Sequence, residues 1–327
     1  MQYPTISEYV KANQDASDNL DMSTEATNAE LLKEAITDEF GVEYSKDGRK
    51  LLKAPQKLDG TYSIKEGVRI ICNNAFSGCF SLKSLVIPDS VTRIGDSAFF
   101  CCDFLRSVVI PDSVTNIGDG AFGYCYSLTS IAIPSSVTSI GEGAFNGCSS
   151  LTDIAIPDSV TSIGDNTFMG CTSLSSLVIP SGVTSIGNRS FYGCTSLSSL
   201  VIPESVVSIK GNLFCGWYGE LKCLSPNFIF EDGVLYDKDK STIISFRDQD
   251  ITSYVIPDYV TSIGARAFSG CESLTSLVIP DRVVSIGHGA FRGCSSLTSL
   301  VIPDSVTSIG DCVFDGCKSL NSVVIPD

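Results

Sequence analysis

The sequence predicts a β-rich repeat solenoid, because one segment returns every 23 residues and because its apolar positions return with it. The repeat is most easily followed in its Ile-Pro pairs and its phenylalanines. The prolines of these pairs are Pro88, Pro111, Pro134, Pro157, Pro180 and Pro203, and after an interruption Pro257, Pro280, Pro303 and Pro326. The phenylalanines are Phe76, Phe99, Phe122, Phe145, Phe168, Phe191, Phe214, Phe268, Phe291 and Phe314. Such a column predicts a stacked aromatic spine.

Each repeat begins with a short strand. In residues 81–103, Leu85 and Ile87 alternate with polar or small residues, so both are expected to point into the core. Pro88 ends this strand because it has no N–H to continue a ladder. Coils stacked in this way form a parallel sheet.

The second half of the repeat is expected to turn. Gly95 is predicted to permit a tight bend, and Ala98 and Phe99 are predicted to lie on a short helical or 3₁₀ turn. A single repeat cannot enclose these apolar side chains, so only stacking closes the core.

Composition excludes several functions. The net charge of −15 argues against binding to nucleic acid or to an anionic membrane surface. No apolar run approaches the ~20 residues needed to span a bilayer, and no secretory signal is visible at the N-terminus. The residues alone therefore do not decide where the protein is located.

Nine of the 14 cysteines fall at one repeat position: Cys79, Cys102, Cys125, Cys148, Cys171, Cys194, Cys271, Cys294 and Cys317. Equivalent side chains of stacked coils run parallel at ~4.8 Å, which is poor disulfide geometry. We expect buried thiols that pack as small apolar groups. Cys215 and Cys223 lie outside the column, and whether they pair stays undecided.

The chain divides into five segments. Residues 1–37 are expected to form a helical cap or tether, with Ile6, Tyr9 and Val10 on one helix and Asn28 capping a second that carries Leu31, Leu32, Ala35 and Ile36 on one face. A β-hairpin cap is expected over 38–66, a first repeat block over 67–214, an irregular insertion with a second hairpin over 215–251, and a second block over 252–327.

The two hairpins are predicted from an internal match. The segment at 41–47 resembles the segment at 233–239 at an offset of 192 residues, and Tyr62 falls on Tyr254. Each copy shows an apolar strand, a Lys-Asp turn and a second apolar strand.

A column of small apolar residues is expected on the outer side of the concave strands. It contains Val86, Val109, Val178, Val201, Val255, Val278 and Val301, with Ala132 and Ala155 in two coils and Val324 at the end. Apolar stripes of this length often mark partner surfaces. Alternatively, the valines are present only because β-branched residues are favoured in strands. Trp217 and Tyr218, in the irregular insertion, are two further candidates for partner binding; alternatively, Trp217 fills the gap between the blocks.

Enzymatic motifs are lacking. The sequence has no P-loop, nucleophile elbow or HExxH, and its one histidine is His288. We therefore predict no enzyme and no cofactor. Most Ile-Pro pairs are followed by an acidic residue. Such a residue is favoured in turns, and weak cation binding is the alternative explanation for it.

The repeat S-L-x-S-L-x-I-P-x-S-V-x-x-I-G-x-x-A-F-x-G-C resembles the leucine-rich repeats of the Bacteroides surface protein A (BspA)-like, or Treponema pallidum, type over about residues 62–327. The resemblance implies a right-handed solenoid with a parallel sheet on its concave side, and a source among the Bacteroidetes. It also implies a non-enzymatic cell-surface protein that binds host matrix proteins, other bacteria or epithelial cells.

Three functions follow as hypotheses. The first is protein or glycan binding at the cell surface through the concave face. The second is an intracellular protein scaffold, and the third is a glycan- or cation-binding structural array. Self-association through the last coil is a further expectation, since an exposed strand edge can pair with another chain.

Overall fold

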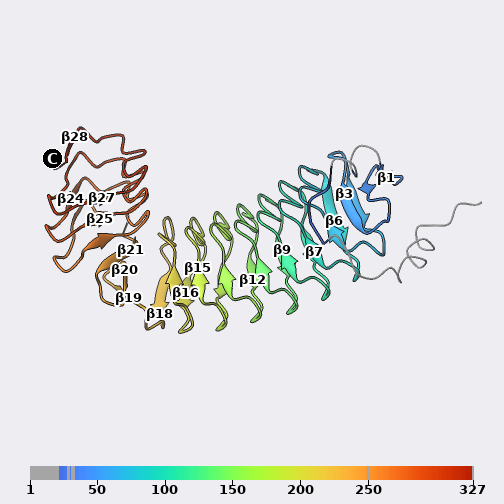
Figure 1. The fold of residues 1–327 in the computed structure, drawn as a ribbon, viewed down its shortest axis with the longest axis horizontal. Coiled ribbons are helices and arrows are strands. Elements are labelled where there is room, and N and C mark those ends of the chain that lie inside the picture. Colours follow the sequence, from blue (N-terminus) through green and yellow to red (C-terminus); the bar gives the residue numbers. More distant parts are fainter. Residues whose placement is uncertain (1–21, 28–29, 31–33, 249, 326–327) are drawn as a thin grey trace, which may run out of the picture.

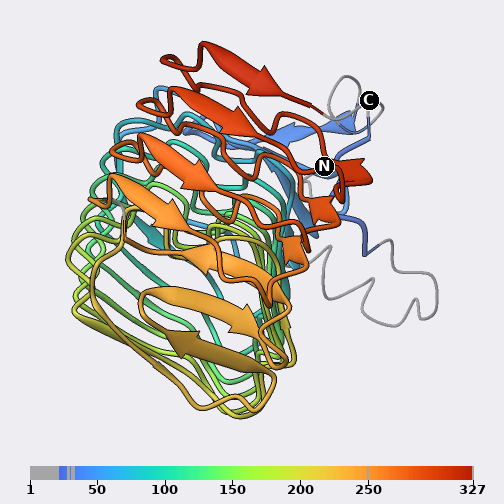
Figure 2. The ribbon, with the colours of Figure 1, turned by 90° about the vertical axis from the view of Figure 1, so that its left-hand side faces the viewer.

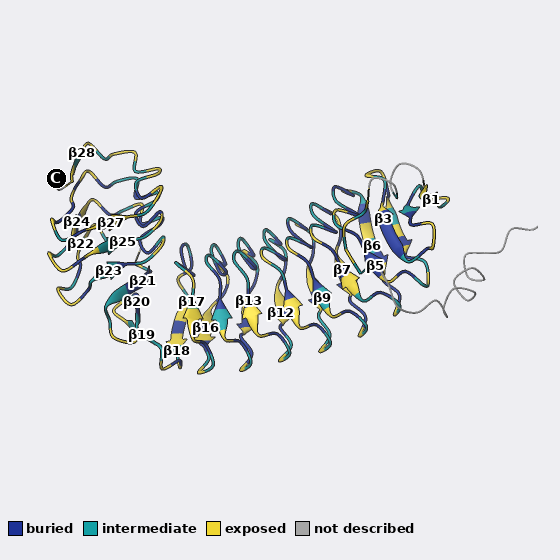
Figure 3. Cartoon of the chain, in the orientation of Figure 1, coloured by how far each residue is buried: buried dark blue, intermediate teal, exposed yellow. Residues whose placement is uncertain are grey.

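The computed structural model describes residues 22–27, 30, 34–248 and 250–325. Figure 1 shows a single stack of coils that bends into an arc, with the N-terminal coils at one end and the second block turned at the other. Buried and exposed residues alternate along each coil, as the colours of Figure 3 show. The predicted solenoid with its 23-residue period and parallel sheets is confirmed.

Two columns of parallel strands run along the first block, and each coil contributes one strand to each column. The short strands are β5 (Ile70–Ile71), β7 (Arg93–Ile94), β9 (Asn116–Ile117), β11 (Ser139–Ile140), β13 (Ser162–Ile163), β15 (Ser185–Ile186) and β17 (Ser208–Ile209). The longer ones, here called the valine strands, are β4 (Gly60–Ser63), β6 (Leu82–Val86), β8 (Ser107–Val109), β10 (Ser130–Ala132), β12 (Asp153–Ala155), β14 (Ser176–Val178), β16 (Ser199–Ile202) and β18 (Glu220–Cys223). Where valine strands of neighbouring full repeats pair, they do so at 23-residue spacing, for example Ser107 with Ser130.

The second block repeats this arrangement. Its short strands are β23 (Ser262–Ile263), β25 (Ser285–Ile286) and β27 (Ser308–Ile309), and its valine strands are β22 (Ser253–Val255), β24 (Ser276–Val278), β26 (Ser299–Val301) and β28 (Ser322–Val324). In the last described coil Ile309 and Ile325 are exposed. Self-association there stays a prediction.

Both predicted hairpins are present, and each gains a third strand. β1 (Ile36–Thr37), β2 (Glu43–Tyr44) and β3 (Lys50–Lys53) pair antiparallel, as do β19 (Phe228–Glu231), β20 (Val234–Asp237) and β21 (Thr242–Phe246). The last strand of each set then pairs parallel with the first short strand of its block, β5 or β23. Each set therefore starts a new sheet at the N-terminal side of a block.

The second hairpin separates two cores because its two faces pack in opposite directions. Leu235 and Ile244 join the core of the first block, whereas Val234 and Tyr236 join that of the second. Period-2 alternation of a strand makes this possible. The domain boundaries themselves stay a prediction.

At the first hairpin the N-terminal segment takes the place of a preceding block. Met22, Ala26 and Ala35 pack against Leu52, which corresponds to Ile244 at the 192-residue offset. Thr27 and Glu30 form a reciprocal capping box: the Thr27 N–H donates to Glu30 Oε2 at 2.7 Å and the Glu30 N–H donates to Thr27 Oγ1 at 3.2 Å.

Two sequence expectations about local structure are corrected, and two fall outside the described residues. Ile36 lies in strand β1 instead of on a helix face, and the expected helical turn at Ala98–Phe99 is a series of non-helical turns. The helix expected around Tyr9, and the cap expected at Asn28, lie outside the described residues.

Gly95 has a different role from the one predicted. Its φ is not positive, but a Cβ there would lie 2.6 Å from the backbone N of Asn73 in the preceding coil. The glycine therefore allows close stacking of coils. The left-handed turn is made by the glycine before most column cysteines, as at Gly147, whose φ is +74°.

The phenylalanine spine and the cysteine column fill the core. Phe99, Phe122 and Phe145 are buried and nearly parallel, with ring centroids 5.0 and 5.7 Å apart. Seven of the nine column thiols donate to a phenylalanine carbonyl 26 residues earlier, as Cys148 Sγ does to Phe122 O at 3.1 Å. The Sγ of Cys79 instead donates to Pro55 O at 3.5 Å, and no such bond is found for Cys271. All 14 cysteines, including Cys215 and Cys223, are free thiols.

Burial of these thiols predicts alkaline sensitivity. Desolvation raises the pKa of Cys194 and of Cys294 from 9.0 to about 12 and holds the pKa of Cys148 well above its usual value. The unfolded chain ionises at lower pH than the folded one, so the free energy of unfolding should fall as pH rises from 9 toward 12. Urea melts between pH 7 and 10 should show this fall, and Cys194→Ala should reduce its slope. A midpoint independent of pH in this window would contradict the burial of the thiols.

Candidate functional site

The exposed side of the valine strands is the most continuous apolar surface of the repeats. Period-2 alternation in each valine strand buries the middle residue and exposes its neighbours: Leu177 is buried, while Ser176 and Val178 face outward. The valines Val86, Val109, Val178, Val201, Val255, Val278, Val301 and Val324 are all exposed, up to 71% for Val109 and 74% for Val178. We call this row, with exposed Ala132 and Ala155, the valine face.

The valine face lies on the outer side of the bend in the second block. Figure 2 shows strands β22, β24, β26 and β28 on the side toward the reader, which is the left-hand side of Figure 1, away from the first block. This position differs from the concave side that was expected from the sequence. Sheet ladders are interrupted between β14 and β16, which agrees with coils that spread apart on this side.

A groove of about 390 Å³ lies on the valine face at this interruption. Its lining includes Ser176, Val178, Ser199 and Val201. Hydroxyl and methyl groups thus alternate along a shallow surface between two coils, and the arrangement can bind a partner by shape and apolar contact. It presents no group that could act as a nucleophile with a base beside it.

Trp217 is wrong as a surface candidate. Its side chain is fully buried, its indole N–H donates to Leu197 O at 2.6 Å, and its ring packs on Phe214. The guanidinium of Arg247 lies 4.5 Å from the indole centroid. The indole lies in the core of the first block, next to Arg247 of the segment that follows the second hairpin. The repeat period could have predicted this burial, because Trp217 lies 23 residues after Cys194 and therefore in the cysteine column.

Tyr218 is exposed, at 61%, but the structure does not bring it into the row of valines. The row position in its coil belongs to Lys222, which pairs in register with Val201. Tyr218 instead follows the cysteine column, at the position of Thr195 in the preceding coil. The valine face is therefore interrupted by a charge where the two blocks meet.

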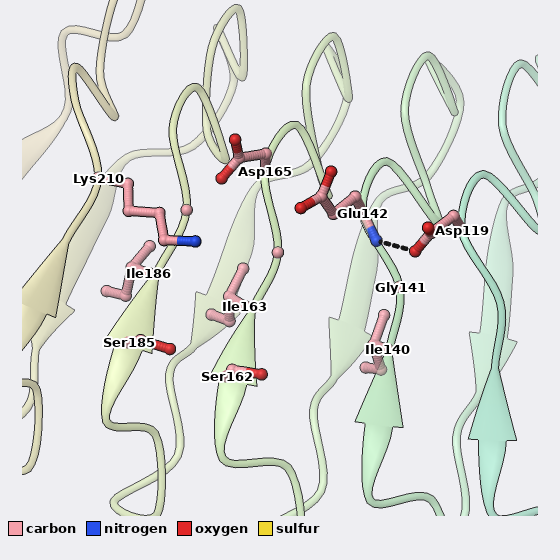
Figure 4. A pocket seen from close by; sticks show the side chains of 12 residues that line it. Asp119, Ile140, Gly141, Glu142, Ser162, Ile163, Asp165, Ser185, Ile186 and Lys210 are labelled. Carbon is pink, nitrogen blue, oxygen red and sulfur yellow. Dashed lines mark hydrogen bonds between the residues drawn. The ribbon is translucent and has the colours of Figure 1, made fainter. Parts of the chain in front are cut away.

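A second cavity, of about 240 Å³, lies over the short strands β11, β13 and β15 (Figure 4). Asp119, Glu142 and Asp165 line it from successive coils, and Lys210 closes one end. The carboxylates have a structural use, since Asp119 Oδ1 accepts the Glu142 N–H at 2.7 Å. Such bonds tie each coil to the next.

Neither metal ligation nor a membrane span is found in the described part of the chain. No group of three or more His, Cys, Asp or Glu side chains there could hold a metal ion. No helix among those residues is long and apolar enough to cross a bilayer.

The sequence alone did not predict a group of aromatic residues in the turns next to the cysteine column of the first three coils. We call this part of each coil the turn edge. Phe80, Phe104 and Tyr126 are exposed. Phe100 and Tyr124 are half-buried, and the Tyr124 ring packs against those of Phe100 and Tyr126. We call these five residues the aromatic patch. A departure from the repeat could have indicated this group, because later coils carry small polar residues after the cysteine, such as Ser149 and Thr172.

Comparison with known proteins agrees with the repeat geometry. The family described as BspA type leucine rich repeat region matches residues 60–173, 115–225 and 243–327. No curated protein matches the chain.

Solved structures share the fold. A leucine rich cell surface protein from Faecalibacterium prausnitzii A2-165 is similar, with 28% identity, a TM-score of 0.64, and coverage of 89% of this chain and 92% of that one. A leucine-rich repeat protein from Eubacterium ventriosum shows 31% identity and a TM-score of 0.57 over 68% of this chain and 60% of its own. The pneumococcal vaccine antigen PcpA, at 20% identity, 88% and 80% coverage and a TM-score of 0.58, is similar in fold alone. With its 23-residue coils, stacked phenylalanines and matched repeats, the chain belongs to the BspA-type leucine-rich repeat family.

Proposed function

We propose that this protein is a non-enzymatic binding module that uses the valine face to hold a protein or glycan partner at the cell surface. The observation that carries the proposal is the row of valines, which recurs in both blocks and is exposed in the part of the chain that the structure describes. Similarity to a leucine rich cell surface protein supports the location.

Apolar contact supplies the affinity in this account. Burying an exposed valine contributes about 1.5 kcal/mol or more, so a few such contacts outweigh the weak polar contacts of the neighbouring serines. Shape complementarity in the groove at Val178 and Val201 would supply specificity. Extracellular-matrix proteins and surface glycans are the classes of partner that we would screen first.

Introducing charge on the valine face should abolish binding. A Val178→Lys, Val201→Lys double variant places two cations in the groove, and desolvating them against an apolar partner should weaken binding at least tenfold. Binding to a screened matrix protein or glycan, measured by surface plasmon resonance, checks this.

The chain offers a matched control. Val207 and Val284 are also exposed, at 62% and 46%, but lie beside the short strands. A Val207→Lys, Val284→Lys variant has the same added charge and should bind as the parent does. Equal loss in both variants would show an effect of charge alone, and no loss in the first would place the site elsewhere.

Surface display has its own test. Protease added to intact cells should digest the protein, with a cytoplasmic protein as the protected control. Complete protection until lysis would contradict display and favour the intracellular scaffold hypothesis instead.

A further inference from the structure

The aromatic patch combines exposed rings with a carboxylate that lacks a partner. Phe100 and Tyr124 pack edge to face with centroids 5.2 Å apart, and Tyr124 and Tyr126 do so at 6.0 Å. Asp103 lies in the same turn edge, and its Oδ1 is buried with no hydrogen-bond partner among the described residues. A carboxylate whose buried oxygen has no donor costs free energy, and the Asp103 side chain as a whole is only partly buried, so a donor from a partner can still reach the carboxylate.

Backbone strain at the patch points the same way. Cys101 and Tyr124 have φ of 57° and 58°, at the position where most coils carry glycine, such as Gly147 at 74°. A left-handed conformation costs an L-residue roughly 1–2 kcal/mol. Strain of this kind clusters at functional sites, and here it places the Tyr124 ring over Gly147 of the next coil.

The chain's own packing shows which group such rings accept. The guanidinium of Arg247 lies 4.5 Å from the Trp217 centroid and 5.3 Å from that of Phe230. Arg189 lies 5.6 Å from the ring of Tyr192, which occupies in its coil the position of Phe100. In the part of the chain that the structure describes, no lysine or arginine lies over Phe100, Tyr124 or Tyr126.

We propose that the aromatic patch with Asp103 binds an arginine side chain of a basic peptide segment in a partner protein. A guanidinium offers planar N–H donors to the partly buried Asp103 carboxylate and a cationic face to the rings. The net charge of −15 attracts basic segments over longer distances. This site is separate from the valine face and does not depend on the function proposed for it.

The test uses the full chain and two blocked peptides, Gly-Gly-Arg-Gly-Gly and the same sequence with citrulline, which keeps the shape but has no charge. Binding is followed by amide chemical shifts in nuclear magnetic resonance. We expect saturable shifts at Asp103 and Tyr126 with the arginine peptide, and binding at least tenfold weaker with citrulline.

Two variants and a control locate the site. Asp103→Asn and Tyr126→Ser should each weaken arginine binding about tenfold; the second installs the residue found at the equivalent position 149. Asp158→Asn removes the same charge from an exposed turn and should change binding less than twofold.

Three results would overturn the proposal. Equal binding of the arginine and citrulline peptides would exclude recognition of a cation, and absence of saturable shifts at these residues would exclude the site. Tighter binding of a neutral oligosaccharide at the same residues would assign the patch to glycans. The Val178→Lys, Val201→Lys variant should bind the arginine peptide within about threefold of the parent, so the two surfaces can fail separately.

Discussion

Replacing Phe122 by alanine should lower the free energy of unfolding by about 3–5 kcal/mol. Phe122 is buried between Phe99 and Phe145, and its ring stacks on both. Neighbouring coils cannot close the resulting cavity, because the stacking of their backbones sets the distance between coils. Chemical denaturation followed by far-ultraviolet circular dichroism measures the change.

The matched control for this prediction is Phe104→Ala. Phe104 is 54% exposed on the turn edge of the preceding coil, so its removal should change stability by less than about 1 kcal/mol. A similar loss in the two variants would show that the spine is not the source of the stability.

Trp217→Ala should also cost about 3–5 kcal/mol, but at the joint between the blocks. The substitution removes the ring contact with Phe214, the indole bond to Leu197 O and the stacking of Arg247. Burial lowers the pKa of Arg247. Its guanidinium lies over the Trp217 and Phe230 rings and donates to Gly219 O.

The loss should uncouple the blocks as well as destabilise them. The first and second blocks have separate cores that share the second hairpin, and in repeat proteins the interfaces between units carry cooperativity. Differential scanning calorimetry of Trp217→Ala should therefore resolve two transitions where the parent shows one. A single transition at an unchanged temperature would contradict the role of Trp217 as the joint, and Trp217→Phe should retain most of the coupling.

The repeat made most of the fold predictable. Because Ile-Pro, phenylalanine and cysteine return every 23 residues, the spine, the cysteine column and the parallel strands could be expected position by position. The 192-residue offset predicted both hairpins for the same reason. Tyr44 and Tyr62 share a hydrogen bond, and so do their counterparts Tyr236 and Tyr254.

Departures from the repeat were harder to interpret. Trp217 resembles a surface residue of an irregular loop until it is counted as position 23 after Cys194. The third hairpin strand at Ile36–Thr37 was missed because two residues give too short a pattern. Gly95 was assigned to a bend because sequence does not distinguish a glycine needed for its φ from one needed for close stacking.

The candidate site was predictable in part. Alternation in each strand gave the exposed valines, but the side of the arc on which they lie depends on how neighbouring coils spread, which small differences in packing decide. The aromatic patch depends on the left-handed backbone at Cys101 and Tyr124, which a sequence pattern does not display.

Hydroxyl-radical footprinting of the protein, free and bound to its partner, tests the central claim most directly. The account predicts that Val109, Val178 and Val255 become protected on binding, while Val207 and Val284, which are also exposed, keep their rates of oxidation. Protection of Val207 and Val284, with unchanged rates at Val109, Val178 and Val255, would contradict the assignment of the valine face as the binding surface.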